Sequence, residues 1–216
     1  SHERRPQRRG GALRLIESHT MMFRQTVLFI AALSLGPAHA NAPAQSFGEL
    51  TTVDKVDLNR YIGKWHEIAL FPNRFQAQCV ADTTATYSLK ANGRIDVTNR
   101  CRTQDGRMDE AAGEAKLAVD DGSNAKLKVR FAPAYLAWLP QVWGNYWVIE
   151  LDPNYQFVVV SEPNREFLWI LSRTPQLSEA TLSGIKSRLT ARGFDVAKLQ
   201  FKPHSTQTPQ QTTKLQ

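Results

Sequence analysis

Alternating hydrophobic and polar residues run through most of the chain and predict short β-strands. The strand-like segments are residues 61–70, 80–89, 94–102, 108–119, 125–131, 146–151, 156–161 and 167–172. Turn residues separate them, and Asn92-Gly93 between two alternating segments is the strongest hairpin signal. Closing a sequential meander into a barrel removes its exposed edges. The predicted fold is therefore all-β, an eight-stranded antiparallel up-and-down barrel.

The pattern changes after residues 174–175, Thr-Pro, where a helix is expected. Ser178 is suited to cap its first turn, and Gly193 is suited to end it. The apolar residues between them recur at helical spacing: Leu182, Ile185 and Leu189. A helix with one apolar stripe must pack against another surface, so we expect it outside the barrel. Residues 196–201 are expected to add an edge strand.

Alternation also separates side chains that point into the barrel from those that point outward. The inward set mixes small and aromatic residues, and small residues leave volume that large ones would occupy. An eight-stranded barrel is either filled by side chains or holds one small ligand, and the pattern alone favours neither. An open interior would suit an apolar ligand such as an acyl chain. The candidate ligand-binding residues are Ala85, Tyr87, Leu89, Ile95, Val97, Ala115, Leu117, Leu127, Val129, Phe131, Tyr146, Phe167 and Trp169.

The N-terminal residues do not follow the strand pattern. A short charged start, an apolar run and Ala38-His39-Ala40 together predict a secretory signal peptide cleaved after Ala40; the alternative is a buried core helix. No Cys lies at the cleavage site, where residue 41 is Asn, so we expect a periplasmic product without a lipid anchor in the outer membrane. The expected organisation is an upstream extension over 1–20, the signal peptide over 21–40, a flexible leader over 41–52, the globular domain over 53–204 and a disordered tail over 205–216.

The charge pattern gives no indication of nucleic-acid binding. The net charge is +7, but residues 1–40 contain six Arg and two Glu, so more than half of the excess lies there. In the remainder, basic residues alternate with apolar ones, as in residues 126–130. That pattern is typical of a strand with one solvated face, and no basic stripe is visible.

Cys79 and Cys101 are the only cysteines. In an exported chain we expect them to form a disulfide, and two free thiols are the alternative. With Asn92-Gly93 as the turn, Cys101 should lie opposite about Thr83 and not opposite Cys79. The bond therefore requires a bend or bulge at the start of the second strand.

Three segments resemble the signature blocks of the lipocalin family. Residues 59–69 contain Gly63-Lys64-Trp65, which resembles the Gly-x-Trp motif of the first block. Residues 147–155 and 169–175 are similar to the second and third blocks, in the same order. The subgroup that the chain resembles is that of the bacterial lipocalins (Blc) and apolipoprotein D, over about residues 53–203. The resemblance implies a calyx that binds a fatty acid or lysophospholipid, for lipid storage or transport in envelope maintenance.

The resemblance also assigns structural roles to Gly63, Trp65 and Arg173. Trp65 would plug the closed end of the barrel, and Arg173 would stack across its indole ring. Such a cation–π contact is worth about 1–2 kcal/mol when it is desolvated.

We expect a monomer or dimer that can associate peripherally with the outer membrane.

Residues typical of catalytic or metal sites are sparse after residue 40. His66 and His204 have no triad or metal partner in the sequence, so we expect no enzyme, cofactor or metal site. Glu67 alternates in step with Trp65, so we expect it to point into the closed end, where burial would raise the pKa of its carboxyl. A hydrogen-bonded structural role is expected before that of a general acid. The alternatives are a binder of haem or another pigment, and an isomerase with a nucleophilic calyx thiol, which a disulfide would forbid.

Overall fold

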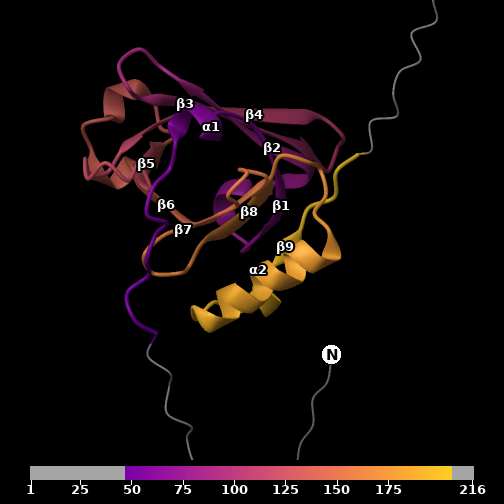
Figure 1. Ribbon diagram of the computed structural model, residues 1–216. Coiled ribbons are helices and arrows are strands. Elements are labelled where there is room, and N and C mark those ends of the chain that lie inside the picture. Colours follow the sequence, from indigo (N-terminus) through magenta and orange to yellow (C-terminus); the bar gives the residue numbers. More distant parts are fainter. Residues whose placement is uncertain (1–46, 206–216) are drawn as a thin grey trace, which may run out of the picture. The chain divides into compact units, whose positions relative to one another are not determined.

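The computed structural model describes residues 47–205, shown in Figure 1. The expected upstream extension, signal peptide and, apart from Ser205, disordered tail lie outside the described residues. Within them the barrel strands are β1 Gly63–Leu70, β2 Cys79–Leu89, β3 Ile95–Thr103, β4 Met108–Leu117, β5 Lys126–Arg130, β6 Gly144–Leu151, β7 Phe157–Ser161 and β8 Leu168–Ser172.

The barrel is a closed antiparallel meander. Each strand pairs with the next, and β1 pairs with both β2 and β8. The predicted fold class is thereby confirmed. Because β1 runs from one end of the barrel to the other and the strands alternate in direction, the β1–β2 and β5–β6 connections lie at the same end. We call this the open end, and the end at which β1 begins the closed end.

The first strand starts later than its alternation predicts, because a short helix precedes it. Helix α1, Leu58–Tyr61, is capped by Asp57, whose side chain accepts a hydrogen bond from the backbone NH of Asn59. Gly63 then turns the chain into β1 with a φ of 96°, a conformation that glycine adopts at little cost. The connections contain single 3₁₀ turns: η1 Arg74–Gln76, η2 Ala134–Leu136, η3 Pro140–Val142 and η4 Val196–Lys198.

The predicted C-terminal helix is present as α2, Glu179–Ala191, and lies outside the barrel (Figure 1). The Ser178 side chain accepts a hydrogen bond from the backbone NH of Thr181 and so caps the first turn. Ile185 and Leu189 are fully buried in a cluster between the helix and the outer face of the sheet. Among the helices of the described residues, none has the length and apolar character needed to cross a membrane.

The described part of the expected flexible leader, residues 47–52, packs against the barrel. Leu50 is buried in the cluster beneath α2. Arg165 donates a hydrogen bond to the Gly48 carbonyl at 2.7 Å, and Arg192 donates one to the carbonyl of Thr51. The buried leucine and these two hydrogen bonds hold residues 47–52 against the barrel.

The C-terminal residues fill a gap that opens between β1 and β2. The short strand β9, Gln200–Phe201, pairs with the last residues of β1. Beyond it, the backbone NH of Lys202 donates to the Ile68 carbonyl at 3.0 Å, and the NH of Asp82 donates to the Pro203 carbonyl at 2.9 Å. The edge strand expected within residues 196–201 is therefore present, although residues 196–198 form a 3₁₀ turn.

At this gap β2 bends away from β1, and this bend is the one that the disulfide requires. The β2–β3 register shifts twice between Cys79 and Thr84, and Asp82 has a φ of 54°. Cys79 consequently pairs with Thr103. The Cα atoms of Cys79 and Cys101 lie 5.4 Å apart, within disulfide range, and the bond is formed.

Candidate functional site

Trp65 and Arg173 seal the closed end of the barrel. Trp65 is completely buried, and its indole NH donates to the Tyr61 carbonyl at 2.8 Å. The guanidinium of Arg173 lies over the indole, with its central carbon 3.7 Å from the ring centroid. It also donates to the carbonyls of Arg60, Tyr61 and Ile62 at the end of α1. Arg173 thus ties the helix that closes the barrel to the wall of the barrel.

Three tyrosines lie inside the barrel above this plug. The hydroxyl of Tyr146 shares hydrogen bonds with the hydroxyls of Tyr61, at 2.7 Å, and Tyr87, at 3.0 Å. Burial raises the pKa of Tyr87 to about 12 and raises the pKa of the other two phenols further. The three hydroxyls are therefore neutral and satisfy one another, and they form a floor for the space above.

A cavity of about 790 Å³ lies inside the barrel; its lining includes the three tyrosines and reaches the open end. That volume lies within the range of small-molecule sites, so the interior is not fully packed. Of the predicted ligand-binding residues, the following border the cavity: Ala85, Tyr87, Ile95, Val97, Ala115, Leu127, Val129, Phe131, Tyr146, Phe167 and Trp169.

Leu89 and Leu117 were predicted to line the cavity, but they lie outside it. Both are the last residues of their strands, at the closed end of the barrel. Leu89 is 42% exposed at the β2–β3 turn, and Leu117 packs against the interior cluster. The alternation of side chains along a strand assigns each residue to a face of the sheet, but it does not show where along the strand the cavity ends.

Aromatic residues gather at the open end. Phe167 stacks on Trp169 with ring centroids 6.0 Å apart, and Phe75 lies 5.8 Å from Phe167. Phe75 belongs to η1 and is 60% exposed. On the connection between β5 and β6, Tyr135 and Trp138 are both about three-quarters exposed. The cavity lining toward the open end therefore combines aromatic side chains such as Phe75 and Phe167 with charged ones such as Arg74 and Asp109.

Glu67 is a buried carboxyl in the cavity wall. It is 3% exposed, and burial raises the pKa of its carboxyl to about 7, although Gln76 and Lys202 oppose the shift. The Gln76 amide donates to Glu67 Oε2 at 2.7 Å, and Trp169 Nε1 donates to Gln76 Oε1 at 2.8 Å. The expected hydrogen bond is present, but Gln76 donates it from the β1–β2 connection at the open end, and not at the closed end where Glu67 was expected to point.

The sequence pattern did not reveal several residues that line the cavity. Val56 and Leu58 approach it from the segment that covers the closed end, and Gln76, Val142 and Trp143 approach it from connections at the open end. Period-2 alternation identifies only residues on strands, so these positions carried no signal. Glu67 and Gln76 meet through the fold of the β1–β2 connection.

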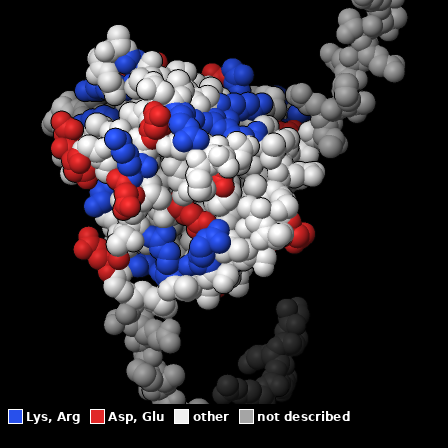
Figure 2. Space-filling model, in the orientation of Figure 1, with Lys and Arg blue, Asp and Glu red and all other residues white. Residues whose placement is uncertain are grey.

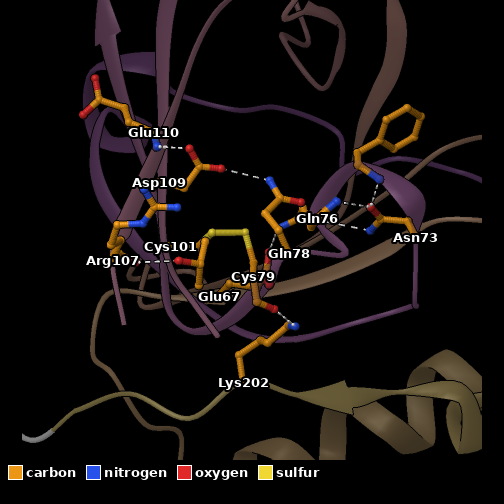
Figure 3. The surroundings of a disulfide bond; sticks show 12 residues. Glu67, Asn73, Gln76, Gln78, Cys79, Cys101, Arg107, Asp109, Glu110 and Lys202 are labelled. Atoms are coloured by element: carbon orange, nitrogen blue, oxygen red, sulfur yellow. Dashed lines mark hydrogen bonds between the residues drawn. A yellow bond between two sulfur atoms is a disulfide. The ribbon is translucent and has the colours of Figure 1, made fainter. Parts of the chain in front are cut away.

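The disulfide lies at the open end and forms part of the cavity wall. Figure 3 shows the bond between Cys79 and Cys101, with Lys202 donating a hydrogen bond to the Cys79 carbonyl. Gln78 donates to Asp109 at 3.1 Å, which joins the start of β2 to β4. Since these are the only cysteines in the chain, no thiol is left free. Among residues 47–205, no group of three or more His, Cys, Asp or Glu residues could hold a metal ion.

Both charge signs are present on the outer surface. Figure 2 shows Lys and Arg side chains interspersed with Asp and Glu on the face in view. Several of them are paired across strands, as in the ion pairs of Glu114 with Lys90 and Arg94. Pairs between well-exposed side chains, such as that of Arg100 with Glu110, contribute little to stability, typically about 0–1 kcal/mol each.

Sequence comparison decides the family. Residues 56–204 match the family described as Lipocalin-like domain. The chain belongs to the lipocalin family. It is 40% identical to temperature-induced lipocalin-1 of Arabidopsis thaliana over 166 residues, covering 76% of this chain and 88% of the relative. It is 37% identical to the outer membrane lipoprotein Blc of Escherichia coli K12 over 150 residues, covering 69% and 80%.

Other comparisons agree with this assignment. This lipocalin is 34% identical to mouse apolipoprotein D over 153 residues, covering 68% of this chain and 76% of the relative. Its fold is similar to that of insecticyanin from Manduca sexta, with a TM-score of 0.58 at 20% identity, covering 74% of this chain and 87% of the other. The predicted relation to Blc and apolipoprotein D is confirmed. Lipocalins bind small hydrophobic ligands, and the cavity described above is the corresponding feature of this chain.

Proposed function

We propose that this lipocalin binds one fatty acid or lysophospholipid in its cavity and stores or transports it in the cell envelope. The supporting observation is the cavity of about 790 Å³, which is closed at one end by Trp65 and the tyrosine floor. Its lining includes aliphatic side chains such as Ile95, Val97 and Val129. An acyl chain would displace water from this surface, while its head group stayed near the open end.

A displacement series across chain lengths tests this proposal. Each buried methylene contributes about 0.8 kcal/mol, so affinity should rise with acyl length. It should then level off or fall when the chain reaches the tyrosine floor, because the closed end cannot lengthen. A fluorescent apolar dye bound in the cavity reports the competition. Affinity that does not change with chain length would contradict binding in the cavity.

Two alternative functions are disfavoured by specific observations. An isomerase of the kind considered from the sequence needs a reactive thiol, whereas both cysteines are bonded to each other. Histidine is a common axial ligand of haem, and among the described residues no histidine lines the cavity. His66 and His204 instead pack against each other with ring centroids 5.1 Å apart, and the cavity lining includes neither. A binding protein without enzymatic activity remains the favoured interpretation.

An envelope location is also part of the proposal. The signal peptide predicted over residues 21–40 supports export, and relatives such as that of Escherichia coli are named outer membrane lipoproteins. The exposed aromatic side chains of Phe75, Tyr135 and Trp138 would support peripheral contact with a lipid surface. N-terminal sequencing of the periplasmic fraction should find a chain that starts at Asn41. A product that still begins near Met21 would contradict export with cleavage.

A further inference from the structure

The three hydroxyls of the tyrosine floor pair with one another, but they share only two hydrogen bonds. Tyr146 bonds to Tyr61 at 2.7 Å and to Tyr87 at 3.0 Å, and no other group of the described residues bonds to these hydroxyls. Each neutral phenol carries one hydrogen, so the floor holds three hydrogens and uses two of them. Whichever way the hydroxyls rotate, one O–H is left without an acceptor.

The spare hydrogen stays in place at ordinary pH. Burial raises the pKa of Tyr87 to about 12, and it raises the pKa values of Tyr61 and Tyr146 well above 10. A buried donor without an acceptor destabilises the state that contains it. Water in the cavity can accept from this O–H, whereas an alkyl chain that replaces the water cannot. A purely apolar ligand therefore leaves the floor with an unpaired donor.

The hydroxyls meet in the middle of the barrel and not in its wall. Tyr87 lies on β2 and Tyr146 on β6, and three strands separate β2 from β6 in either direction around the closed barrel. The two side chains therefore reach toward each other from opposite sides, and their hydroxyls come within 3.0 Å. The cavity borders all three tyrosines. Tyr146 is only partly buried although it packs inside the barrel, so its accessible surface faces the cavity.

The surroundings of the floor favour an uncharged acceptor. Among the described residues that border the cavity, the cations are Arg74, on η1 at the open end, and Arg100, which is paired with Glu110 at 2.6 Å. Arg173 does not border the cavity. A ligand carboxylate at the floor would be desolvated without a counter-ion, which costs more than one hydrogen bond from a phenol returns. A hydroxyl or ketone oxygen costs less to bury and accepts the same hydrogen bond.

We propose that the tyrosine floor is a subsite for an uncharged hydrogen-bond acceptor, such as a terminal hydroxyl or a ketone, at the inner end of an apolar ligand. The spare O–H of the floor donates to that oxygen, and a ligand hydroxyl donates in turn to a tyrosine oxygen. The cavity thereby accepts chains that are polar at both ends and apolar between them. This inference rests on the proposed function, since it requires an acyl chain in the cavity with its carboxylate near the open end.

The test compares each saturated fatty acid with the acid that carries a hydroxyl in place of its terminal methyl group. Both displace N-phenyl-1-naphthylamine from the full chain at pH 8. When the chain is too short to reach the floor, its hydroxyl is buried beside aliphatic side chains, and we expect the hydroxy acid to bind at least about tenfold more weakly. At the length where the affinity of the plain acids levels off, the difference should fall to about threefold or less, because the hydroxyl then meets the floor.

A triple variant removes the donors and keeps the rings. In Tyr61→Phe, Tyr87→Phe, Tyr146→Phe, the hydroxy acid of the levelling length should again bind at least about tenfold more weakly than the plain acid, because no phenol accepts or donates. Removing one hydroxyl does not suffice, since the two that remain share at most one bond and again leave one O–H free. The control is Tyr155→Phe. It removes a hydroxyl that accepts from the Asp57 backbone NH at 2.9 Å, but Tyr155 does not border the cavity, so the difference should stay unaltered.

An infrared measurement tests the same hydrogen bond without any variant. The probe is a fatty acid of the levelling length with a ketone next to its terminal methyl group, labelled with ¹³C at the ketone carbon. A hydrogen bond to a carbonyl oxygen lowers its stretching frequency. We expect the labelled band of the bound probe at a lower wavenumber than that of its methyl ester in hexane. A band at the hexane position would overturn the subsite.

The outcomes distinguish this inference from the function on which it rests. A tenfold or larger difference at every chain length, or the same difference in the triple variant as in the unmodified protein, would overturn the subsite. If the affinity of the plain acids nevertheless rises with chain length, the proposed lipid binding stands without it. If no acid of either kind displaces the dye, the proposed function and the subsite are both wrong. If the triple variant does not fold, the infrared band decides.

Discussion

The guanidinium of Arg173 lies over the ring of Trp65, with its central carbon 3.7 Å from the ring centroid, at the end of the barrel opposite the cavity entrance. Arg173 follows β8 and Trp65 lies on β1, so the contact joins two strands that meet where the barrel closes. The same guanidinium donates hydrogen bonds to the last carbonyls of α1. Burial lowers the pKa of Arg173, but the group stays charged at neutral pH.

We expect Trp65→Ala to affect stability more than ligand choice. Truncation of a fully buried tryptophan costs about 3–5 kcal/mol of unfolding free energy. Because the two side chains are in contact, Arg173→Ala should cost less in the Trp65→Ala background than in the unmodified protein. Urea unfolding of the four proteins in a double-mutant cycle measures this. Strict additivity would mean that the stacking contributes nothing.

The disulfide should account for a substantial part of the stability. Cys79 and Cys101 are 22 residues apart, and closing a loop of that size contributes about 3 kcal/mol in the chain-entropy model. The double variant Cys79→Ser, Cys101→Ser should lose about this amount in urea unfolding. Titration of the unmodified protein under denaturing, non-reducing conditions should detect no free thiol. Two reactive thiols per chain would contradict the bond and restore the thiol isomerase as an alternative.

Filling the cavity from its wall should reduce ligand binding without unfolding the barrel. Val129 borders the cavity on β5 and is only partly buried, so Val129→Trp can place its ring in the space that the ligand would occupy. We expect at least about a tenfold loss of affinity for a long-chain lipid, equivalent to two buried methylenes. Val119→Trp, at an exposed position, is the control. Unchanged affinity in Val129→Trp would place the ligand elsewhere.

The pKa of Glu67 should make stability depend on pH. Its folded-state pKa is about 7, above the ordinary value of 4.5, because burial disfavours the charged form. The folded state therefore binds the proton more tightly, and stability falls as pH rises from about 4.5 to 7, by up to roughly 3 kcal/mol. The positive charge of Lys202 lowers the pKa of Glu67 and so opposes the effect of burial. The Tyr87 hydroxyl adds no pH dependence here, because burial raises its pKa to about 12.

His66 acts in the opposite direction over a similar range. Its pKa is lowered from 6.5 to about 4 by burial and by the neighbouring His204 and Lys64, so its contribution to stability is lost as pH falls. The two slopes partly cancel in the unmodified protein. Glu67→Gln should remove the loss of stability with rising pH and leave the effect of His66 in place. The stability of this variant, relative to that of the unmodified protein, should therefore increase from pH 5 to pH 8. Thermal unfolding at a series of pH values measures this difference, and a difference independent of pH would exclude the raised pKa.

Gly113 should tolerate no side chain. A Cβ atom there would lie 2.6 Å from the Arg130 carbonyl oxygen and 2.7 Å from the Phe131 ring. Gly113→Ala should push Phe131 away from the cavity wall and cost about 1–3 kcal/mol of unfolding free energy. Gly48→Ala, where nothing lies within 4 Å of the added atom, should change stability little. A fully stable Gly113→Ala protein would show that the β4–β5 contact adjusts freely.

Local pattern carried much of the information about the fold. The alternation of β2 and β3 around Asn92-Gly93 fixed their register, and this register correctly required a bulge before Cys79 could meet Cys101. The helical spacing after Ser178 correctly predicted α2. Both are short-range effects, because turn geometry and side-chain period act between residues close together in the chain. Alternation correctly placed Leu89 and Leu117 on the inward side of their strands, but it could not show that the cavity ends before it reaches them.

By itself, the sequence determined the barrel, its outer helix and the strand residues that share a face wherever the alternation is regular, and the resemblance to lipocalins implied the plug of Trp65 and Arg173. Only the tertiary structure decided that the interior is open, because cavity volume depends on how side chains from all eight strands pack together. It also decided that Gln76 bonds to both Glu67 and Trp169, and that residues 200–205 enter the gap between β1 and β2. These contacts join residues that are distant in the chain or lie in loops without a repeating pattern, and no local periodicity records which of them come together.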